Sequence, residues 1–417
     1  MSNEVDLGNE PVKHLLFILA VPAIVSQLVN ALYNMVDRMY IGHIADIGAT
    51  ALTGVGVCFP IIMIVSAFAY LVGMGGAPRA SIFMGRGDRK TAEKILGNCF
   101  SALLAVAAVL TAIVLIFQRP LLYMFGASDN TIGYAMDYMT IYAVGTVFVQ
   151  LTLGLNAFIS AQGFSKISMM TVVIGAISNI VLDPVFIFAF DMGVRGAALA
   201  TVISQAISAV WALRFLCGKK ATLKIRRENM PISLSILLPA VALGIAPFVM
   251  QFTESVLVLC FNSSLLKYGG DLAVGTMTIL SSVMQFAMLP LQGFTQGGQP
   301  IISFNYGAGS LHRVKEAFKL QTMCCLGYSC ILWALVQLFP SIFVAVFTDD
   351  PELAEMSCWA LRIYMAMICI MGLQTSCQQT FVAFGNAKTS SFLAIFRKII
   401  VLIPLIYILP VFMEDNV

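Results

Sequence analysis

The stretch "LLFILAVPAIVSQLVNALYNMVD" at residues 15–37 decides the class of fold. It is apolar over most of its length and longer than the about 20 residues that an α-helix needs to cross a hydrocarbon core. Lipid offers no partners to backbone polar groups, so such a stretch must bond internally as a helix. It therefore predicts a membrane-spanning helix, and its last residue, Asp37, places an acid near one end of that helix.

The composition extends this prediction to the whole chain. Of 417 residues, 59% are hydrophobic and 11% charged, and the mean hydropathy is +0.90, whereas a soluble domain carries about 25% charged residues. The formal net charge is only +3, and we expect no nucleic-acid partner. The ten cysteines include no CxxC motif and no Cys/His cluster, which predicts neither a disulfide framework nor a structural metal site.

Eleven apolar spans can be read along the chain. Their approximate limits are 14–37, 50–78, 94–117, 133–158, 167–190, 195–216, 233–262, 272–300, 317–340, 356–382 and 390–412.

Lys and Arg gather in alternate connections, which predicts the orientation because cytoplasmic loops carry an excess of these residues. We therefore expect a multi-pass protein of the cytoplasmic membrane with a cytoplasmic N-terminus. The basic residues that carry this prediction are Arg79, Arg86, Arg89, Lys90 and Lys94; Lys219, Lys220, Lys224, Arg226 and Arg227; Arg313, Lys315 and Lys319; and Lys388, Arg397 and Lys398.

The two halves of the chain resemble each other. "GGAPRASIFMG" (75–85) aligns with "GGQPIISFNYG" (297–307), and "AQGFSK" (161–166) aligns with "AFGNAK" (383–388). Both matches have the same offset of 222 residues, which indicates an internal repeat. Because this offset spans six helices, an even number, the two repeats should be parallel bundles related by an axis along the membrane normal.

The repeat predicts an all-α integral membrane protein with a six-helix lobe over residues 1–216 and a second lobe over 233–417. The basic segment 217–232 would be the linker on the cytoplasmic side. The span at 195–216 lacks a counterpart in the second half, so we expect a twelfth helix to be missing after Val417.

Three acids lie within the spans: Asp37, Asp183 and Glu254. A charged group at the bilayer centre costs about 2.5–3.5 kcal/mol on insertion scales, so such residues are functional candidates. Asp37 shares a helix face with Tyr33 and Asn30, one and two turns earlier. We expect Tyr33 beside a bound ion and Asn30 in a substrate cavity.

Asp183 has Asn179 one turn earlier and Pro184 directly after it, which predicts a bent helix. Thr201 in the next span reaches the same depth if the two helices are antiparallel neighbours, and Asn156 is a further buried polar candidate. Two carboxylates and several neutral oxygens suit a monovalent cation or a proton, so we expect Na⁺ or H⁺ at Asp37 and Asp183.

Other interpretations of these residues remain open. Asp37 could be a solvated acid at the outer end of its helix, and Asp183 could mark only the kink. Glu254 could be a lone packed acid or a charge that contacts substrate. Met284 and Gln285, in "VMQFAMLPL", could line a cavity or serve ordinary helix packing.

Four motifs make the chain resemble the multidrug and toxic compound extrusion (MATE) family, in its bacterial DinF/MepA-like branch. They are "LAVPAIVSQLVNALYNMVDRMYIGH" (19–43), "SNIVLDPVFIF" (178–188), "GAALATVISQ" (196–205) and "GGQPIISFNYGAG" (297–309). The resemblance implies two six-helix lobes in a V around a central cavity. It also implies antiport of organic cations or drugs against Na⁺ or H⁺. The implied coupling residues are Asp37, Asn179, Asp183, Thr201 and Asn156.

We therefore expect a monomeric, cation-coupled antiporter that works by alternating access, needs no cofactor and is not an enzyme. A flippase for a lipid-linked or amphiphilic substrate is the alternative, although such a protein should line its cavity with basic residues. An intramembrane enzyme would need a nucleophile–base pair or a motif such as HExxH, which the sequence lacks. A channel fits less well with carboxylates concentrated in one half.

Overall fold

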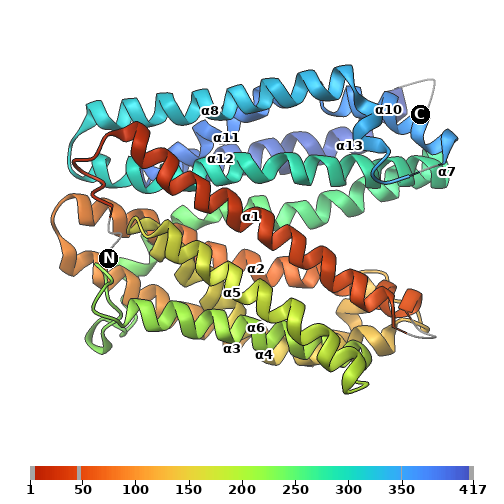
Figure 1. The fold of residues 1–417 in the computed structure, drawn as a ribbon, viewed down its shortest axis with the longest axis horizontal. Coiled ribbons are helices and arrows are strands. Elements are labelled where there is room, and N and C mark those ends of the chain that lie inside the picture. Colours follow the sequence, from red (N-terminus) through yellow and green to blue (C-terminus); the bar gives the residue numbers. More distant parts are fainter. Residues whose placement is uncertain (1–4, 45–47, 349, 413–417) are drawn as a thin grey trace.

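The computed structural model describes residues 5–44, 48–348 and 350–412, and within them all regular secondary structure is helical (Figure 1). The elements are α1 (Val12–Gly42), α2 (Gly48–Gly85), α3 (Arg89–Met124), α4 (Ile132–Ala161), α5 (Ser165–Pro184), the π-helix η1 (Val185–Ala189), α6 (Gly193–Leu216), the 3₁₀-helix η2 (Arg227–Asn229), α7 (Leu234–Gly307), α8 (Leu311–Leu338), α9 (Pro340–Val344), α10 (Pro351–Tyr364), α11 (Ile368–Ala383), α12 (Ala387–Ile395), the π-helix η3 (Phe396–Leu402) and α13 (Ile403–Phe412).

Among the described residues, ten helices are long and apolar enough to cross a membrane. The count rises to eleven when α10 and α11, which are bent by 49° relative to each other, are taken as one broken span. α7 holds two of the ten, Leu234–Glu254 and Gly275–Gly307, and Figure 1 shows its green and teal parts each running the length of the molecule. α1 begins at the left of Figure 1 and α13 ends at the right, so the first and last helices end on opposite sides of the molecule.

Several basic residues expected in loops are helical instead. α2 continues through Arg79 to Gly85, and Arg313 and Lys315 belong to α8. The largest correction concerns Arg397 and Lys398, which lie on η3 inside the last span, Ala387–Ile408. The prediction that these two residues belong to a cytoplasmic connection is wrong: they lie near the middle of the span, inside the limits 390–412 that the hydropathy pattern itself gave.

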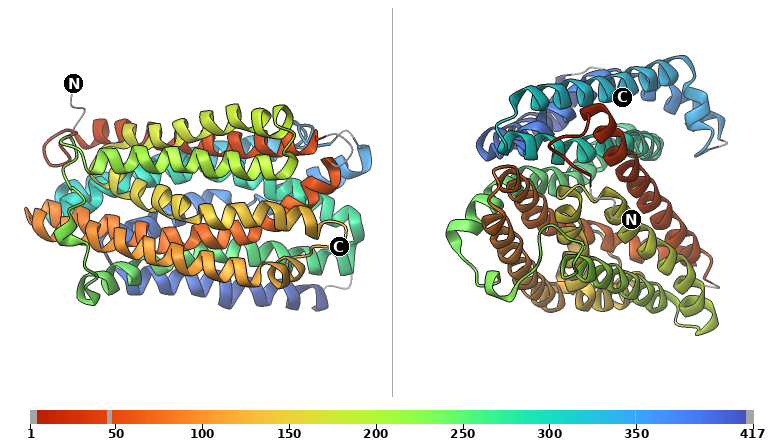
Figure 2. Two further views of the ribbon diagram at one scale, coloured as in Figure 1. Left: turned by 90° about the horizontal axis from the view of Figure 1, so that it is seen from below. Right: turned by 60° about the vertical axis from the view of Figure 1, so that its left-hand side comes forward.

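The helices form two groups that lie one above the other in Figure 1. α2 to α6 occupy the lower half, the teal part of α7 and α8 to α13 occupy the upper half, and α1 runs diagonally between them, as the right view of Figure 2 also shows. The first part of α7 packs on the lower group, where Ala240 joins a core built mainly from α2, α3 and α4. The start of α1 packs in a core with α7 and α8, where Leu15 and Leu19 meet Ile301 and Val314. Its other end packs with the lower group, where Ile41 joins a core built mainly from α2 and α4. α1 therefore connects the two groups.

α2 and α7 cross at two glycines that occupy equivalent positions in the repeat. A Cβ atom on Gly85 would lie 1.9 Å from the Phe304 carbonyl oxygen, and one on Gly307 would lie 2.0 Å from the Ile82 carbonyl oxygen. Gly85 and Gly307 are 222 residues apart, and so are Ile82 and Phe304. The contact is therefore reciprocal, as expected for two copies of one unit related by an axis between them. Only glycine allows the two backbones to approach so closely.

Candidate ion-binding site

The site begins where α5 stops being a regular α-helix. Asp183 is fully buried and stands just before Pro184, the last residue of α5. Proline has no N–H to donate to the preceding turn, and the chain continues as the π-helix η1, in which the Phe190 N–H donates to the Val185 carbonyl at 2.9 Å. The regular α-helix thus ends at Pro184, whereas the predicted bend of the helix stays a prediction. π-helical turns inside α-helices often occur at functional sites.

Asn179 connects α5 to α6. Its Nδ2 donates to Asp183 Oδ1 at 3.3 Å and approaches Thr201 Oγ1 at 3.5 Å. One turn of α5 therefore places the amide and the carboxylate on the same face, and α6 brings the hydroxyl to them. The predicted reach of Thr201 to this depth is confirmed.

Asp37 of α1 faces Asp183 across the gap between the two helices. Their carboxyl groups are close enough to share a hydrogen bond when one of them is protonated, and Tyr33 lies near both. Arg38 is the nearest charge of opposite sign, but its guanidinium stacks 4.8 Å above the Phe59 ring. In the described residues, neither carboxylate forms an ion pair within 4.0 Å.

Several oxygens of this cluster are buried without a hydrogen-bond partner in the part of the chain that the structure describes. They are Asp37 Oδ1, Asn179 Oδ1 and Asp183 Oδ2. Buried polar atoms normally find a partner, so orphaned ones need an explanation, such as an ion or a water molecule. All three are electron-pair donors, and together with Thr201 Oγ1 they make a set of hard oxygen ligands. This set fits a small monovalent cation, and equally a proton shared by the two carboxyl groups.

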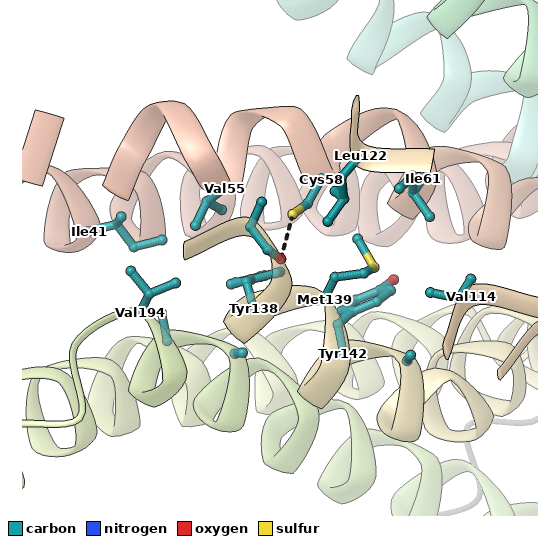
Figure 3. Close-up of a cluster of buried hydrophobic side chains, with 14 of the residues drawn as sticks. Ile41, Val55, Cys58, Ile61, Val114, Leu122, Tyr138, Met139, Tyr142 and Val194 are labelled. Atoms are coloured by element: carbon teal, nitrogen blue, oxygen red, sulfur yellow. Dashed lines mark hydrogen bonds between the residues drawn. The ribbon is translucent and has the colours of Figure 1, made fainter. Parts of the chain in front are cut away.

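Tyr138, on α4, is a member of the cluster that sequence reasoning missed. Its side chain is 3% exposed, and its hydroxyl lies within hydrogen-bonding reach of Thr201 and near Asp37. Figure 3 shows it beside Tyr142 and Met139 in the packed core of the lower helix group. An aromatic residue near the start of an apolar span usually serves packing. The only sign in the sequence that Tyr138 belongs to the cluster is that its hydroxyl would lie at the same depth as Asp37.

Two other predicted residues are less directly placed. Asn156 lies on α4 one turn beyond Thr152, whose hydroxyl donates to the Gln205 carbonyl on α6 at 3.1 Å. Its buried Oδ1 has no hydrogen-bond partner among the described residues. The Asn30 carbonyl accepts from Asn34 Nδ2 at 2.7 Å, and its side chain is half-buried. The roles expected for Asn156 and Asn30 stay predictions.

The substrate-cavity candidates of the second half have different surroundings. Glu254 is not a lone packed acid: its side chain is 62% exposed, and its Oε1 bonds the Lys398 ammonium. Met284 packs against the core around Leu280 and Val336, which fits ordinary helix packing, and Gln285 is exposed.

Metal sites of the usual kind are not indicated by the described residues. No group of three or more His, Cys, Asp and Glu side chains among them could hold a metal ion. The Asp37–Asp183 cluster has only two such residues, and its other oxygens are neutral.

Two helix groups related by a repeat, with a buried carboxylate pair in one of them, define a multi-pass membrane protein of duplicated architecture. The MatE family model matches the chain twice, over residues 22–185 and again over residues 247–408. These matches cover well over half of the chain, which therefore belongs to the MatE family, the multidrug and toxic compound extrusion transporters. The double match also supports the internal repeat.

Curated relatives are named as export proteins. The Multidrug export protein MepA of Staphylococcus haemolyticus (strain JCSC1435) is 25% identical over 390 residues, which are 94% of this chain and 85% of the relative. The protein of the same name from Staphylococcus aureus (strain NCTC 8325 / PS 47) is 24% identical over the same shares.

Solved structures confirm the architecture. One described as MATE in the bent conformation has a TM-score of 0.90 at 22% identity, over 98% of this chain and 90% of that chain. Another, described as the outward-facing conformation of a multidrug resistance MATE family transporter, has a TM-score of 0.91 at 21% identity, over 100% and 92%. The predicted all-helical membrane fold with two repeated bundles is thus confirmed.

Proposed function

We propose that the protein is an antiporter of the cytoplasmic membrane that exports organic cations or drugs in exchange for Na⁺ or H⁺. The observation that carries the proposal is the carboxylate pair Asp37 and Asp183: one oxygen of each, together with Asn179 Oδ1, is buried without a hydrogen-bond partner among the described residues. The names of the curated relatives, multidrug export proteins, support the choice of substrate. In this proposal the N-terminus lies on the cytoplasmic side of the membrane, and the protein functions as a monomer.

The carboxylate pair supplies the coupling. Two like charges in a buried site disfavour each other, and a proton or a cation between them removes the repulsion. At about 4 Å and an effective dielectric constant of about 20, two unit charges interact by about 4 kcal/mol. A complete switch of a two-state equilibrium, from 1:99 to 99:1, takes about 5.5 kcal/mol. Relief of a repulsion on this scale is of the same order as the free energy that a switch between two lobe arrangements needs, provided that the two carboxylates are close together in only one arrangement.

Alternating access follows from where the pair sits. Asp37 is on α1, the helix that packs on both helix groups, and Asp183 is on α5 of the lower group. A change in the attraction between these two residues therefore acts on the helix that connects the groups. Ion binding then favours one arrangement, drug binding favours the other, and the two ligands exchange across the membrane.

The alternative function, a flippase for a lipid-linked or amphiphilic substrate, is favoured by one observation. Arg397 and Lys398 lie inside the last span and supply basic residues at membrane depth. A flippase would need these cations for transport, and it would work without the Asp37–Asp183 pair.

The test is efflux of the cationic dye ethidium from cells that lack other pumps, comparing the unaltered chain with Asp183→Asn at matched membrane amounts. Asp137→Asn is the control, since Asp137 is an acid that is 39% exposed and pairs with Arg195 at 2.8 Å outside the cluster. We expect Asp183→Asn to abolish efflux and Asp137→Asn to retain it. Normal efflux by Asp183→Asn would refute the proposal.

A further inference from the structure

The last span carries two cations at mid-length. Arg397 and Lys398 stand on the π-helix η3, between α12 and α13, within the span Ala387–Ile408. A cation at the centre of a membrane helix costs about 2.5–3.5 kcal/mol on insertion scales, and such residues are rare without a task. The equivalent positions of the first half, 222 residues earlier, are Gly175 and Ala176, so the repeat does not account for the charges.

The surroundings of these cations form a connected polar network. The Lys398 ammonium, 7% exposed, bonds Glu254 Oε1 and also donates to the Met250 carbonyl at 3.2 Å. The Arg397 guanidinium donates to Gln374 Oε1, and Gln374 Nε2 donates in turn to Gln378 Oε1 at 2.5 Å. Side chains from α7, α11 and η3 thus converge on one site, which we call the C-terminal charge cluster: Glu254, Gln374, Gln378, Arg397 and Lys398.

The charges of this cluster do not balance. It holds two cations and one carboxylate, and Glu254 is the only acid that the structure brings near Arg397 among the described residues. Glu254 is already bonded to Lys398, so the Arg397 guanidinium has a neutral amide as its direct partner. An uncompensated cation at membrane depth is stabilised when an anion joins it, and a guanidinium fits a carboxylate with two parallel hydrogen bonds.

The cluster lies where the two helix groups meet. One turn of α7 carries Met250, Gln251 and Glu254, and Gln251 Nε2 lies 3.0 Å from Met63 Sδ on α2, in the other group. Met250 Sδ, in contrast, is 3.1 Å from Gln378 Nε2 on α11. Glu254 is i+3 from Gln251 and i+4 from Met250, so it stands between the face toward α2 and the face toward α11. Its side chain is 62% exposed there, which leaves the cluster open on one side.

We propose that the C-terminal charge cluster is a binding site for an anionic group, the carboxylate of an amphiphilic substrate. The Arg397 guanidinium receives the carboxylate, the Lys398 ammonium adds charge, and Glu254 limits the net attraction by holding Lys398. One part of this inference rests on the proposed transport function, namely that the bound carboxylate belongs to a transported substrate. A transporter with a pair of acids in one half of the chain and cations in the other would accept molecules that carry both a cationic and an anionic group.

The test uses two rhodamine dyes that differ in one group: a methyl ester, which is a cation, and its free acid, which adds a carboxylate. Binding of each dye to purified protein in phosphatidylcholine nanodiscs is followed by fluorescence polarisation, without any ion gradient. We expect Arg397→Gln to weaken binding of the acid about tenfold, the scale of one charge-assisted contact, and to leave the ester within about twofold. Glu254→Gln should shift the acid in the opposite direction, toward tighter binding.

Two further variants separate the charge from structural effects. Arg397→Lys keeps a cation and should retain much of the preference for the acid. Arg362→Gln removes an exposed cation of α10, outside the cluster, and should change neither dye. The proposal is overturned if Arg397→Gln weakens both dyes equally, if it changes neither, or if the unaltered protein does not bind the acid.

A lipid phosphate is the other source of an anion. Nanodiscs containing phosphatidylglycerol decide between the two: if this lipid displaces the acid and its retention by the protein depends on Arg397, the site belongs to lipid and the carboxylate proposal is wrong. The proposed transport function fails separately. If neither the unaltered protein nor any variant transports either dye in vesicles, while the differences in binding remain, the anion site is supported and the proposed antiport is refuted.

Discussion

In the first half of the chain, Asp37 on α1 and Asp183 on α5 face each other without an ion pair among the described residues, whereas in the second half Glu254 is bonded to the Lys398 ammonium. The same repeat thus contains an unneutralised pair of acids in one half and a neutralised acid in the other. The glycine crossing, in contrast, is reciprocal in its smallest details. The repeat has kept its backbone contacts and changed its charges, so the two halves need not share one task.

The largest effect should come from the acid pair. Asp37→Asn and Asp183→Asn should each lower ion-coupled dye efflux at least about 100-fold, equal to about 2.7 kcal/mol, because a single remaining carboxylate has no like charge whose repulsion the ion could relieve. The double variant should be no worse than either single one, since both residues hold the same ion. Efflux rates in proteoliposomes measure this cycle, and additive losses would mean that the two acids act separately.

The glycine crossing should respond equally in both halves. Gly85→Ala and Gly307→Ala each place a Cβ against a backbone carbonyl of the other helix, and each should destabilise the protein by about 1–3 kcal/mol, the scale of overpacking. Gly327→Ala on α8 is the control, because a Cβ there meets no atom within 4 Å.

Thermal unfolding in detergent compares these three glycine variants. The control should gain up to about 1 kcal/mol, since alanine is the better helix former. Clearly unequal losses at Gly85 and Gly307 would contradict the symmetry of the contact.

The Glu254–Lys398 pair should show an asymmetry that the acid pair lacks. Glu254→Gln leaves the buried Lys398 charge without its counter-ion and should cost about 1–2 kcal/mol, less than a fully buried pair because Glu254 is open. Lys398→Met removes the buried charge and leaves an exposed carboxylate, so its cost should stay below about 1 kcal/mol. The unfolding midpoints of the two variants test this order of stability losses. A larger loss for Lys398→Met than for Glu254→Gln would contradict it and would mean that the Glu254 carboxylate needs the lysine as its counter-ion.

The smallest effect concerns two helix caps at equivalent positions of the repeat. Asp88 caps α3 by accepting from the Thr91 N–H at 3.0 Å, whereas Ser310 begins α8 without such a bond. The contact with Thr91 lowers the pKa of Asp88 below its ordinary value of 3.8.

A lowered folded-state pKa stabilises the protein above the unfolded value and loses this contribution as the pH falls through the folded value. Asp88→Ser should therefore change stability near neutral pH only a little. The unaltered protein should lose a small part of its melting temperature between about pH 5 and pH 3, and the variant should lack this contribution. An unchanged pH profile would mean that Asp88 does not contribute through its charge.

Much of the acid cluster could be predicted because its geometry is local. Asn179 and Asp183 are one helical turn apart, and Thr201 lies on the next helix along the chain. Only the position of Asp37 against Asp183 required a long-range contact, and the motifs shared with the MATE family indicated it.

The charge cluster of the second half could not be predicted in the same way. Lys398 meets an acid on another helix, 144 residues away in sequence, and no local spacing reports such a pair. Basic residues are also the usual sign of a cytoplasmic loop, and this rule assigned Arg397 and Lys398 to a connection although the apolar span at 390–412 includes them. The break between α10 and α11 at residues 365–367 was hidden for another reason: Met-Ala-Met contains neither Pro nor Gly, so the sequence carries no local sign of it.

The central claim, that the Asp37–Asp183 pair couples the ion, is tested most directly by counting ions and dye in one experiment. Proteoliposomes loaded with ethidium are given an inward Na⁺ or H⁺ gradient, and ion entry per dye released is measured for the unaltered chain, Asp183→Asn and Glu254→Gln. The account predicts a fixed ratio in the unaltered chain and in Glu254→Gln, and no ion entry linked to dye in Asp183→Asn. Loss of coupling in Glu254→Gln with coupling retained in Asp183→Asn would place the ion site in the other half and contradict the account.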